Sequence, residues 1–408
     1  MSVGARRVAV TGVGAVSALG ADAARFWEAL SAGRSGIGPI GCVDCTGLRF
    51  ANGAEVRGYD PAAHFERKQS DMMDRFAQLG VVAAREAVAA AGVEWTPELR
   101  ESAAVVTGAC VGGQASEEQV FIDAYQNNRH RAHPLTVPRV MMNAAASQIT
   151  MDLGLMGPAF TVSSACSSAN HAIGQAFWMV RSGAAELAVA GGSEAPFAFG
   201  HLKGWDAIRA VSPDTCRPFS RDRKGMVLGE GGAMLVLEPL EAALARGATV
   251  LAELVGFGMS ADAHHLTAPS AQGAARAIRA ALRDAGIAPE RVGYVNAHGT
   301  GTAANDPMET SAIRDVFGAH ADRLAVSATK SMHGHALGAA GALEAVATVL
   351  ALRHGILPPT ANFTEPDPEC DLDVVPNVAR QAEVEHAVSN SFAFGGLNAV
   401  LAFRRWDA

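Results

Sequence analysis

The sequence predicts an α/β fold made of two similar half-domains, each a sheet with helices on both faces. Residues 85–93 have the pattern of a helix that ends at a glycine, and residues 102–106 then form a short apolar strand. The same order recurs over residues 278–287 and 292–295. A unit that occurs twice in one chain indicates duplication, and alternating helices and buried strands indicate layers of helix and sheet.

The other elements fit this scheme. Residues 5–20 form a first strand and a loop, because glycines break the apolar run that a signal peptide would need. Apolar residues at helical spacing predict a buried helix over 169–182, followed by a strand over 187–190. A helix over 338–353 and its return strand repeat this pair. Residues 358–376, rich in proline and aspartate, predict a long surface loop.

Composition limits the classes of function. With 408 residues, of which 49% are hydrophobic and 18% charged, the chain can bury a large core. Its net charge of −8 argues against nucleic acid or an anionic membrane surface as the main partner. We expect no membrane insertion, because no segment has the ~18 uninterrupted apolar residues of a membrane-spanning helix. The six cysteines show no paired framework, which favours a reducing compartment, the cytoplasm.

Cys166 is the candidate nucleophile. It lies in the run Thr161-Val-Ser-Ser-Ala-Cys-Ser-Ser-Ala-Asn-His171, directly before a predicted helix. The positive end of a helix dipole and its unpaired N–H groups favour a thiolate, and these N–H groups can also form part of an oxyanion hole. The alternative is that Cys166 is a small buried hydrophobic residue, which is the usual situation of a free cysteine.

Two histidine motifs far downstream favour the chemical interpretation. His298, in Asn296-Ala-His-Gly-Thr-Gly-Thr302, follows a predicted strand, where side chains project into sites. In Lys330-Ser-Met-His-Gly-His335, we expect His333, His335 or both to face the same cavity. Most of the 13 histidines are expected to have ordinary structural roles, among them His171, His264, His265 and His354.

Two other patterns imitate different functions without further support. Gly12, Gly14 and Gly20 after the first strand resemble a dinucleotide-binding turn, yet no acidic residue ends a second strand where one is needed. Cys42-Val-Asp-Cys45 has redox or zinc spacing, but the sequence supplies no second pair of ligands. We therefore expect neither a nucleotide cofactor nor a metal.

Eight motifs in a fixed order carry a family resemblance. They are Val10-Thr-Gly-Val-Gly14, Ser164-Ala-Cys-Ser167, Ala190-Gly-Gly-Ser-Glu194, Arg217-Pro-Phe-Ser-Arg-Asp222, Leu228-Gly-Glu-Gly231, Asn296-Ala-His-Gly-Thr300, Thr329-Lys-Ser-Met-His-Gly-His335 and Asn390-Ser-Phe-Ala-Phe-Gly-Gly396. Over its whole length the chain resembles the β-ketoacyl-acyl carrier protein synthases, specifically the KAS II-like condensing enzymes of the thiolase superfamily. Residues 202–231 and 358–380 look most like nodulation protein E and other polyene-type ketosynthases.

The resemblance implies a fold and a division of the chain. The family has a thiolase-like duplicated architecture of five layers, α-β-α-β-α, with the site between the halves. Residues 1–250 would form the half that carries the nucleophile, and residues 251–408 the half that carries the two catalytic histidines. A helix-rich insert, about residues 50–150, is expected to cover the site and the dimer face.

The resemblance also implies a decarboxylative Claisen condensation. Cys166 would hold an acyl group, and its own N–H and that of Phe394 would form the oxyanion hole. Malonyl-acyl carrier protein would then lose carbon dioxide, and neutral Nε2–H groups of His298 and His335 would stabilise the enolate. The product would be a β-ketoacyl-acyl carrier protein, in fatty acid, polyunsaturated or polyketide chain elongation.

Further residues receive supporting roles from the same resemblance. Lys330 and Glu344 would form a charge pair that orients the histidines. The chain itself would bind no cofactor, because acyl carrier protein delivers the 4′-phosphopantetheine arm. The residues expected to contact the substrate are Thr300, Thr302, Phe392 and Phe394. A local basic patch would dock the acidic carrier protein, with the candidates Arg67, Lys68, Arg75 and Arg209.

Three residues depart from the family pattern. In the gating stretch 392–398, Ala393 replaces a usual glycine and Leu397 a usual threonine. A β-carbon at position 393 would restrict opening of the loop if the backbone there adopts φ above zero. His333 replaces a usual threonine, so it either perturbs His335 or faces outward.

Two alternatives share the fold. The chain could be the ketosynthase subunit of a type II polyketide heterodimer, with a chain-length-factor subunit as its partner. It could also be a thiolase, although thiolases use a second cysteine in a C-terminal glycine motif and residues 390–398 contain none. The expected partners are acyl carrier protein and either a second copy of the chain or a chain-length factor.

Overall fold

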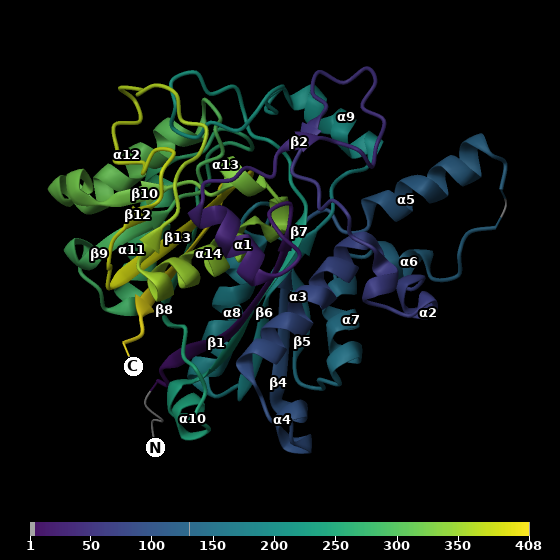
Figure 1. Ribbon diagram of the computed structural model, residues 1–408, viewed down its shortest axis with the longest axis horizontal. Coiled ribbons are helices and arrows are strands. Elements are labelled where there is room, and N and C mark those ends of the chain that lie inside the picture. The colour runs from purple at the N-terminus through teal and green to yellow at the C-terminus, as the bar shows by residue number, and fades with distance from the viewer. Residues whose placement is uncertain (1–4, 130, 408) are drawn as a thin grey trace.

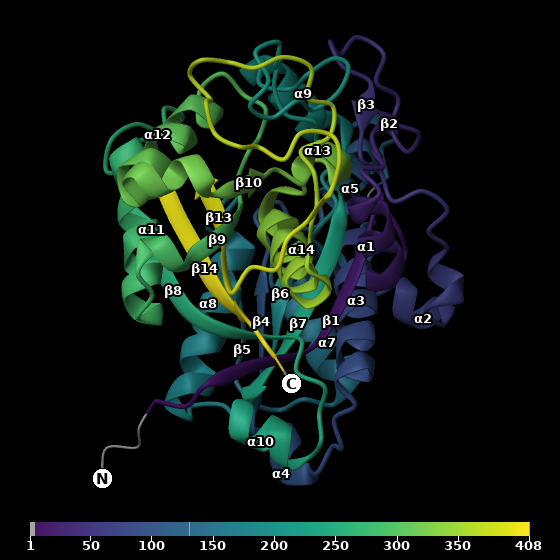
Figure 2. The same cartoon turned by 60° about the vertical axis from the view of Figure 1, so that its left-hand side comes forward.

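The computed structural model describes residues 5–129 and 131–407. In this part of the chain, one continuous sheet has the strand order β10-β9-β13-β14-β8-β1-β7-β6-β4-β5 (Figures 1 and 2). Its strands are β1 (Val8–Ser17), β4 (Ala103–Gly108), β5 (Ala159–Val162), β6 (Leu187–Glu194), β7 (Gly231–Pro239), β8 (Ala252–Ala261), β9 (Val292–Asn296), β10 (Ala325–Ser327), β13 (His386–Ala393) and β14 (Leu397–Arg405). Two short hairpin-like pairs lie apart from it: β2 (Gly38–Pro39) with β3 (Asn52–Gly53), and β11 (Ile356–Leu357) with β12 (Arg380–Gln381).

The sheet consists of two halves with one topology. The first half contains β1, β4, β5, β6 and β7, and the second half contains β8, β9, β10, β13 and β14. Across the sheet, each half begins with its third strand in chain order and continues with its second, fourth, fifth and first. The directions also match, since the first two pairings in each half are parallel and the last two antiparallel. The halves meet where Val8–Val10 of β1 pairs with Ala252–Leu254 of β8. The predicted duplication is confirmed.

Helices complete five layers. The central layer holds α8 (Ser168–Ser182) and α14 (Ala340–His354), which contact strands of both halves. The outer face of the first half is covered by α3 (Arg75–Ala91) and α7 (Ala144–Leu153). On the second half α11 (Ala271–Ala285) packs against the strands, beside α12 (Asn305–Phe317). Figure 2 shows α14 between the two sets of strands.

The apolar composition of α14 follows from its central place. Residues 340–352 of this helix are buried without exception. Within residues 5–129 and 131–407, the segment Leu337–His354 is long and apolar enough to cross a membrane, but 89% of it is buried in the protein. A helix in contact with other elements on all sides needs no polar face.

The range expected for the helical insert is wrong. Within residues 50–150, α3, β4 and α7 belong to the repeated core, and β4 lies inside the sheet. The part that projects consists of 114–129 and 131–140, with α5 at its start (Figure 1). The remaining helices are α1 (Ala23–Ser31), α2 (Arg67–Ser70), α4 (Pro97–Ser102), α5 (Gln114–Phe121), α6 (Thr136–Val140), α9 (Phe199–Ile208), α10 (Leu240–Ala245) and α13 (Lys330–His333).

The glycines of β1 serve packing. A Cβ on Gly14 would lie 2.1 Å from the carbonyl oxygen of Ala83, and one on Gly12 would lie 2.1 Å from that of Ala87. Both carbonyls belong to α3, which therefore crosses the strand at backbone contact. The pattern that imitates a dinucleotide-binding turn thus has a different cause.

Replacement of Gly14 by alanine tests this packing. We expect Gly14→Ala to destabilise the protein by about 1–3 kcal/mol, because α3 must move away from β1 to admit the methyl group. Differential scanning calorimetry would show a lower unfolding temperature. The matched control is Gly204→Ala on α9, where a Cβ meets nothing within 4 Å. Equal unfolding temperatures for the two variants would contradict this account of Gly14.

Candidate active site

Cys166 stands at a sharp turn between β5 and α8, with 8% of its surface exposed. Ala165 before it has a φ of +51°, a conformation that residues with a Cβ rarely adopt. The Ser168 hydroxyl accepts a bond from the N–H of Ser164 at 2.9 Å and donates to the carbonyl of Ala165 at 2.6 Å. These bonds hold the strained turn and fix the direction of the thiol.

Two backbone donors point at the sulfur. Burial raises the pKa of the Cys166 thiol to about 11, and the Lys330 ammonium and the N–H groups of Phe394 and Cys166 oppose the rise. The N–H groups favour the anion as expected, but the cost of desolvating the anion is larger, so the net shift of the thiol pKa is upward. The two N–H groups are those that the family resemblance assigns to an oxyanion hole.

His298 leaves the end of β9, and a buried carboxylate fixes its backbone. Glu309 of α12 accepts bonds from the N–H groups of His298 and Gly299, both at 2.8 Å, and from the amide of Asn390 at 3.1 Å. Burial raises the pKa of Glu309, and these donors oppose the shift. The sequence analysis missed Glu309. An acidic side chain shortly after the histidine motif was the available signal.

Lys330 is fully buried, and all three of its donors are used. They reach the carbonyl oxygen of His298 at 2.7 Å, Nδ1 of His298 at 3.3 Å and the carboxylate of Glu344. Burial raises the pKa of Glu344 to about 7, and Lys330 opposes that rise. The lysine and the glutamate are thus in direct contact at a depth where neither side chain is exposed to water.

Hydrogen bonds fix the same tautomer in both imidazoles. Nδ1 of His298 faces the Lys330 ammonium, which has only donors, and Nδ1 of His335 accepts the N–H of Leu337 at 3.1 Å. Both Nδ1 atoms are therefore acceptors, and the proton of each neutral ring is on Nε2. Burial, followed by the charge of Lys330, lowers the pKa of both rings well below 6.5. The rings are nearly perpendicular, with centroids 5.4 Å apart.

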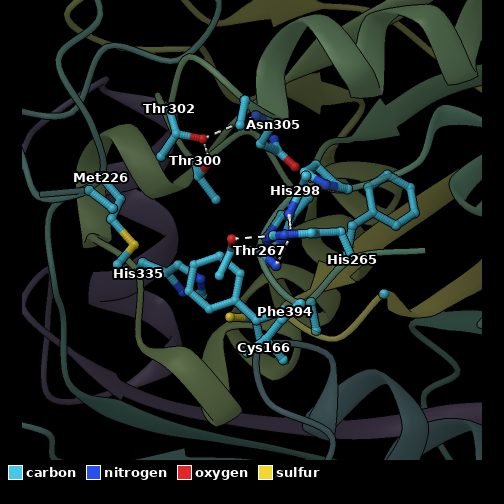
Figure 3. Close-up of a pocket in the computed structure, with 18 of the residues that line it drawn as sticks. Cys166, Met226, His265, Thr267, His298, Thr300, Thr302, Asn305, His335 and Phe394 are labelled. Atoms are coloured by element: carbon cyan, nitrogen blue, oxygen red, sulfur yellow. Dashed lines mark hydrogen bonds between the residues drawn. The ribbon is translucent and has the colours of Figure 1, made fainter. Parts of the chain in front are cut away.

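Cys166, His298 and His335 line one cavity (Figure 3). The hydroxyl oxygens of Thr300 and Thr302 lie 2.9 Å apart in its wall. The lining also includes large apolar side chains, namely Trp205, Met226, Leu266, Phe392 and Phe394.

The turn between β13 and β14 closes one side of the cavity. Phe394 stacks on Trp205 of α9 with ring centroids 6.0 Å apart, and Phe392 lies with its centroid 6.2 Å from that of His298. The side chain of Phe394 is 38% exposed, whereas Phe392 is buried. The two phenylalanines therefore separate the histidines from solvent at the cavity mouth.

The residues of this turn that adopt positive φ are glycines. Gly395 and Gly396 have φ values of +81° and +69°, whereas Ala393 ends β13 outside the left-handed region. The β-carbon of Ala393 therefore causes no strain in this conformation. Leu397 begins β14 and is 38% exposed.

His265 is exposed and lines the cavity, and its bonds within its own loop fit the ordinary structural role expected for it. Its Nδ1 accepts the N–H groups of Thr267 and Ala268, both at 3.1 Å. It belongs to the loop 262–270, where the carbonyl of Leu266 accepts the N–H of Gly395 at 2.8 Å. This loop has no periodic pattern that would have placed His265. The other three histidines for which an ordinary structural role is expected do not line the cavity. They are His171, His264 and His354.

The four docking candidates are not brought together. Arg75 makes two bonds to the buried carboxylate of Glu230, at 2.7 and 2.8 Å, and one to the carbonyl of Val56, so its charge is already paired within the chain. Arg209 is exposed beside Ala210 of the cavity wall. The exposed pair Arg67 and Lys68 lies on α2, apart from α9 in both views (Figures 1 and 2).

The part of the chain that the structure describes shows no metal-type cluster of three or more His, Cys, Asp or Glu side chains. All six cysteines are unpaired thiols. Cys42 and Cys45 lie in the loop between β2 and β3, away from the cavity.

Comparisons with known proteins agree over the full length. The family model for the beta-ketoacyl synthase N-terminal domain matches residues 5–243, and that for the C-terminal domain matches residues 251–364. Nodulation protein E of Rhizobium sp. (strain N33) is 51% identical over 400 residues, covering 98% of this chain and 99% of the relative. The 3-oxoacyl-[acyl-carrier-protein] synthase 2 of Synechocystis sp. is 42% identical over 410 residues, with 98% and 99% covered.

Solved structures give the same result. The ishigamide ketosynthase/chain length factor superposes with a TM-score of 0.94 and 39% identity, covering 99% of this chain and 100% of that one. A type II ketosynthase in complex with its acyl-carrier protein and bound to the hexaketide gives a TM-score of 0.88 and 32% identity, with 99% and 100% covered. This chain belongs to the beta-ketoacyl synthase family and is an acyltransferase-type condensing enzyme.

Proposed function

We propose that this condensing enzyme joins a Cys166-bound acyl group to the two-carbon unit of malonyl-acyl carrier protein, with loss of carbon dioxide. The observation that carries the proposal is the shared tautomer of His298 and His335. Each presents Nε2–H in the cavity that also holds the thiol. Two neutral donors beside one nucleophile suit a reaction that develops an enolate oxygen near a thioester.

The first half-reaction is acyl transfer. The sulfur of Cys166 forms a bond to the acyl carbonyl carbon, and the bond from that carbon to the carrier thiol breaks. The Cys166 proton leaves with the carrier thiol, so no net charge is created. The N–H groups of Cys166 and Phe394 stabilise the oxyanion of the tetrahedral intermediate.

The second half-reaction forms the carbon–carbon bond. The C–C bond to the malonyl carboxylate breaks, carbon dioxide leaves, and the electron pair of that bond forms an enolate. The enolate oxygen accepts hydrogen bonds from the Nε2–H groups of His298 and His335. The enolate carbon attacks the acyl group on Cys166. The sulfur leaves with the bonding electrons and takes up a proton, which restores the thiol.

The substrate arm enters beside the paired threonines. Thr300 and Thr302 offer hydroxyls that suit the amide groups of a 4′-phosphopantetheine arm. This group belongs to the acyl carrier protein, so the chain itself needs no bound cofactor. The ketosynthase complex with an acyl-carrier protein supports the same partner here.

A second subunit is also part of the proposal. Phe121, Tyr125 and Val137 of the projecting segment are 51%, 82% and 65% exposed. Large apolar side chains exposed together are typical of an interface. We propose a homodimer, or a heterodimer with a chain-length factor as in the ishigamide complex. The six free thiols support the cytoplasm.

Substitution of the nucleophile and of one histidine separates the half-reactions. We expect Cys166→Gln to abolish condensation but to retain decarboxylation, because the amide fills the place of an acylated thiol. His335→Ala should still accept an acyl group and should lose decarboxylation by about 10²-fold, the usual effect of removing one oxyanion donor. Radiolabelled carbon dioxide release and the mass of the acyl-enzyme measure the two steps.

His320→Ala is the control, because this imidazole bonds to the carbonyl of Val292 away from the cavity. It should leave both steps unchanged. Equal loss of decarboxylation in Cys166→Gln and His335→Ala would contradict the division of roles.

The pH dependence tests the neutrality of the histidines. Because the pKa of both rings lies well below 6.5, they keep their Nε2–H, uncharged form when the pH falls through the range where an ordinary histidine becomes a cation. Glu344, which contacts Lys330, has a pKa of about 7 and titrates in the same range. Carbon dioxide release by Cys166→Gln should therefore change only near pH 7 between about pH 8 and pH 6, and this change should be absent when Glu344 is also replaced by glutamine. Circular dichroism at each pH would verify the fold. A half-loss of rate near pH 6.5 that persists with Glu344→Gln would show that an unperturbed imidazole controls the step.

Carrier docking is tested at Arg209, because it borders the cavity wall. Arg209→Glu should raise the KM for carrier-bound substrates by about threefold to tenfold and leave small thioester substrates unaffected. Arg283→Glu, an exposed change on α11, is the control. Equal losses on both kinds of substrate would mean that Arg209 supports the turn after α9. Arg67 and Lys68 remain docking candidates for the same assay.

A further inference from the structure

His333 is a fully buried imidazole that the proposed mechanism does not use. It ends α13, it does not line the cavity, and its ring packs against Phe26 of α1 with centroids 6.0 Å apart. It therefore neither faces outward nor touches the substrate. A polar ring at this depth is costly unless both nitrogens are bonded.

Both nitrogens of His333 have partners, and these fix its tautomer. Nδ1 lies 2.8 Å from the carbonyl oxygen of Gly334, and Nε2 lies 3.0 Å from the hydroxyl of Thr329. A carbonyl oxygen only accepts, so Nδ1 carries the proton and Nε2 accepts the Thr329 hydroxyl. The ring thus spans α13 from the residue before the helix to the residue after it.

The carbonyl to which His333 donates is that of Gly334, in the peptide bond between Gly334 and His335. The N–H of the same peptide donates to the carbonyl of Val227 at 2.7 Å, and the carbonyl of His335 accepts the N–H of Gly229 at 2.9 Å. Gly334 has a φ of +68°, which allows alternative orientations at little steric cost. With both of its polar groups bonded, the Gly334–His335 peptide has one orientation.

Helix α13 needs the hydrogen bonds of His333 because it is only four residues long. One helical turn has too few internal bonds to be stable by itself. Yet it carries Lys330 at one end, which bonds Nδ1 of His298, and it is followed by His335 at the other. The relative positions of the two Nε2–H groups therefore depend on the geometry of this turn.

We propose that His333 is a positioning residue that sets the direction of the His335 imidazole through the Gly334 carbonyl. The proposal rests on the role given to His335 under the proposed function. Its contribution is geometric: the two donors must converge on one enolate oxygen, and a displacement of about 1 Å reduces a rate by as much as 10²-fold.

Three substitutions at this position test the idea. Asparagine keeps a donor where Nδ1 was, glutamine moves the amide toward Thr329, and leucine removes both bonds. In the Cys166→Gln background we expect His333→Leu and His333→Gln to lower kcat for carbon dioxide release about tenfold or more, and His333→Asn to retain most of it. KM for malonyl-carrier protein should not change. In enzyme with Cys166 intact, acyl transfer should persist in all three.

The comparison of asparagine with glutamine holds even if the leucine variant fails to fold, since both are polar and of similar size. His320→Leu is the control for loss of a bond from an imidazole to a backbone carbonyl. Equal rates for His333→Asn and His333→Gln, or equal losses in acyl transfer and decarboxylation, would overturn the positioning role. If His335→Ala itself decarboxylates normally, the proposed function fails instead.

Discussion

One buried ammonium determines the geometry and the charge state of the site. Lys330 is 0% exposed, and a cation at that depth costs several kcal/mol unless it is fully paired. Its three donors are shared between Glu344 and two atoms of His298. Removal of the ammonium would leave Glu344 without its counter-charge and would free Nδ1 of His298. The tautomer and ring direction of His298 depend on this contact, and the charge of Lys330 adds to burial in keeping both histidines neutral.

Neutral donors have a chemical advantage over cations here. A malonyl group approaches as a carboxylate, and binding that is stronger in the ground state than in the transition state does not accelerate the reaction. An imidazolium would attract the carboxylate that must leave, whereas a neutral Nε2–H responds mainly to the charge that develops on the enolate oxygen. Lys330 contacts His298 at Nδ1, the nitrogen on the opposite side of the ring from the donor, and its charge is paired with Glu344. The positive charge is close enough to depress the imidazole pKa.

The sequence predicts the duplicated core well, because buried helices and strands have a local periodicity. It also predicts which motifs lie at strand and helix ends, and hence the three side chains that meet in the cavity. It does not predict contacts that only the chain topology creates. Arg75 and Glu230 are 155 residues apart, and nothing near Arg75 indicates that its charge is already paired. Glu309 was missed for the same reason, since its partners come from other elements.

The protonated state of the Cys166 thiol has a consequence for the lifetime of the enzyme in a cell. Peroxides and electrophiles react with thiolates, so oxidative damage follows the thiolate fraction and the exposure of the sulfur. Burial raises the pKa of the Cys166 thiol and leaves only 8% of the residue exposed. Both effects act against oxidation of the sulfur in the free enzyme.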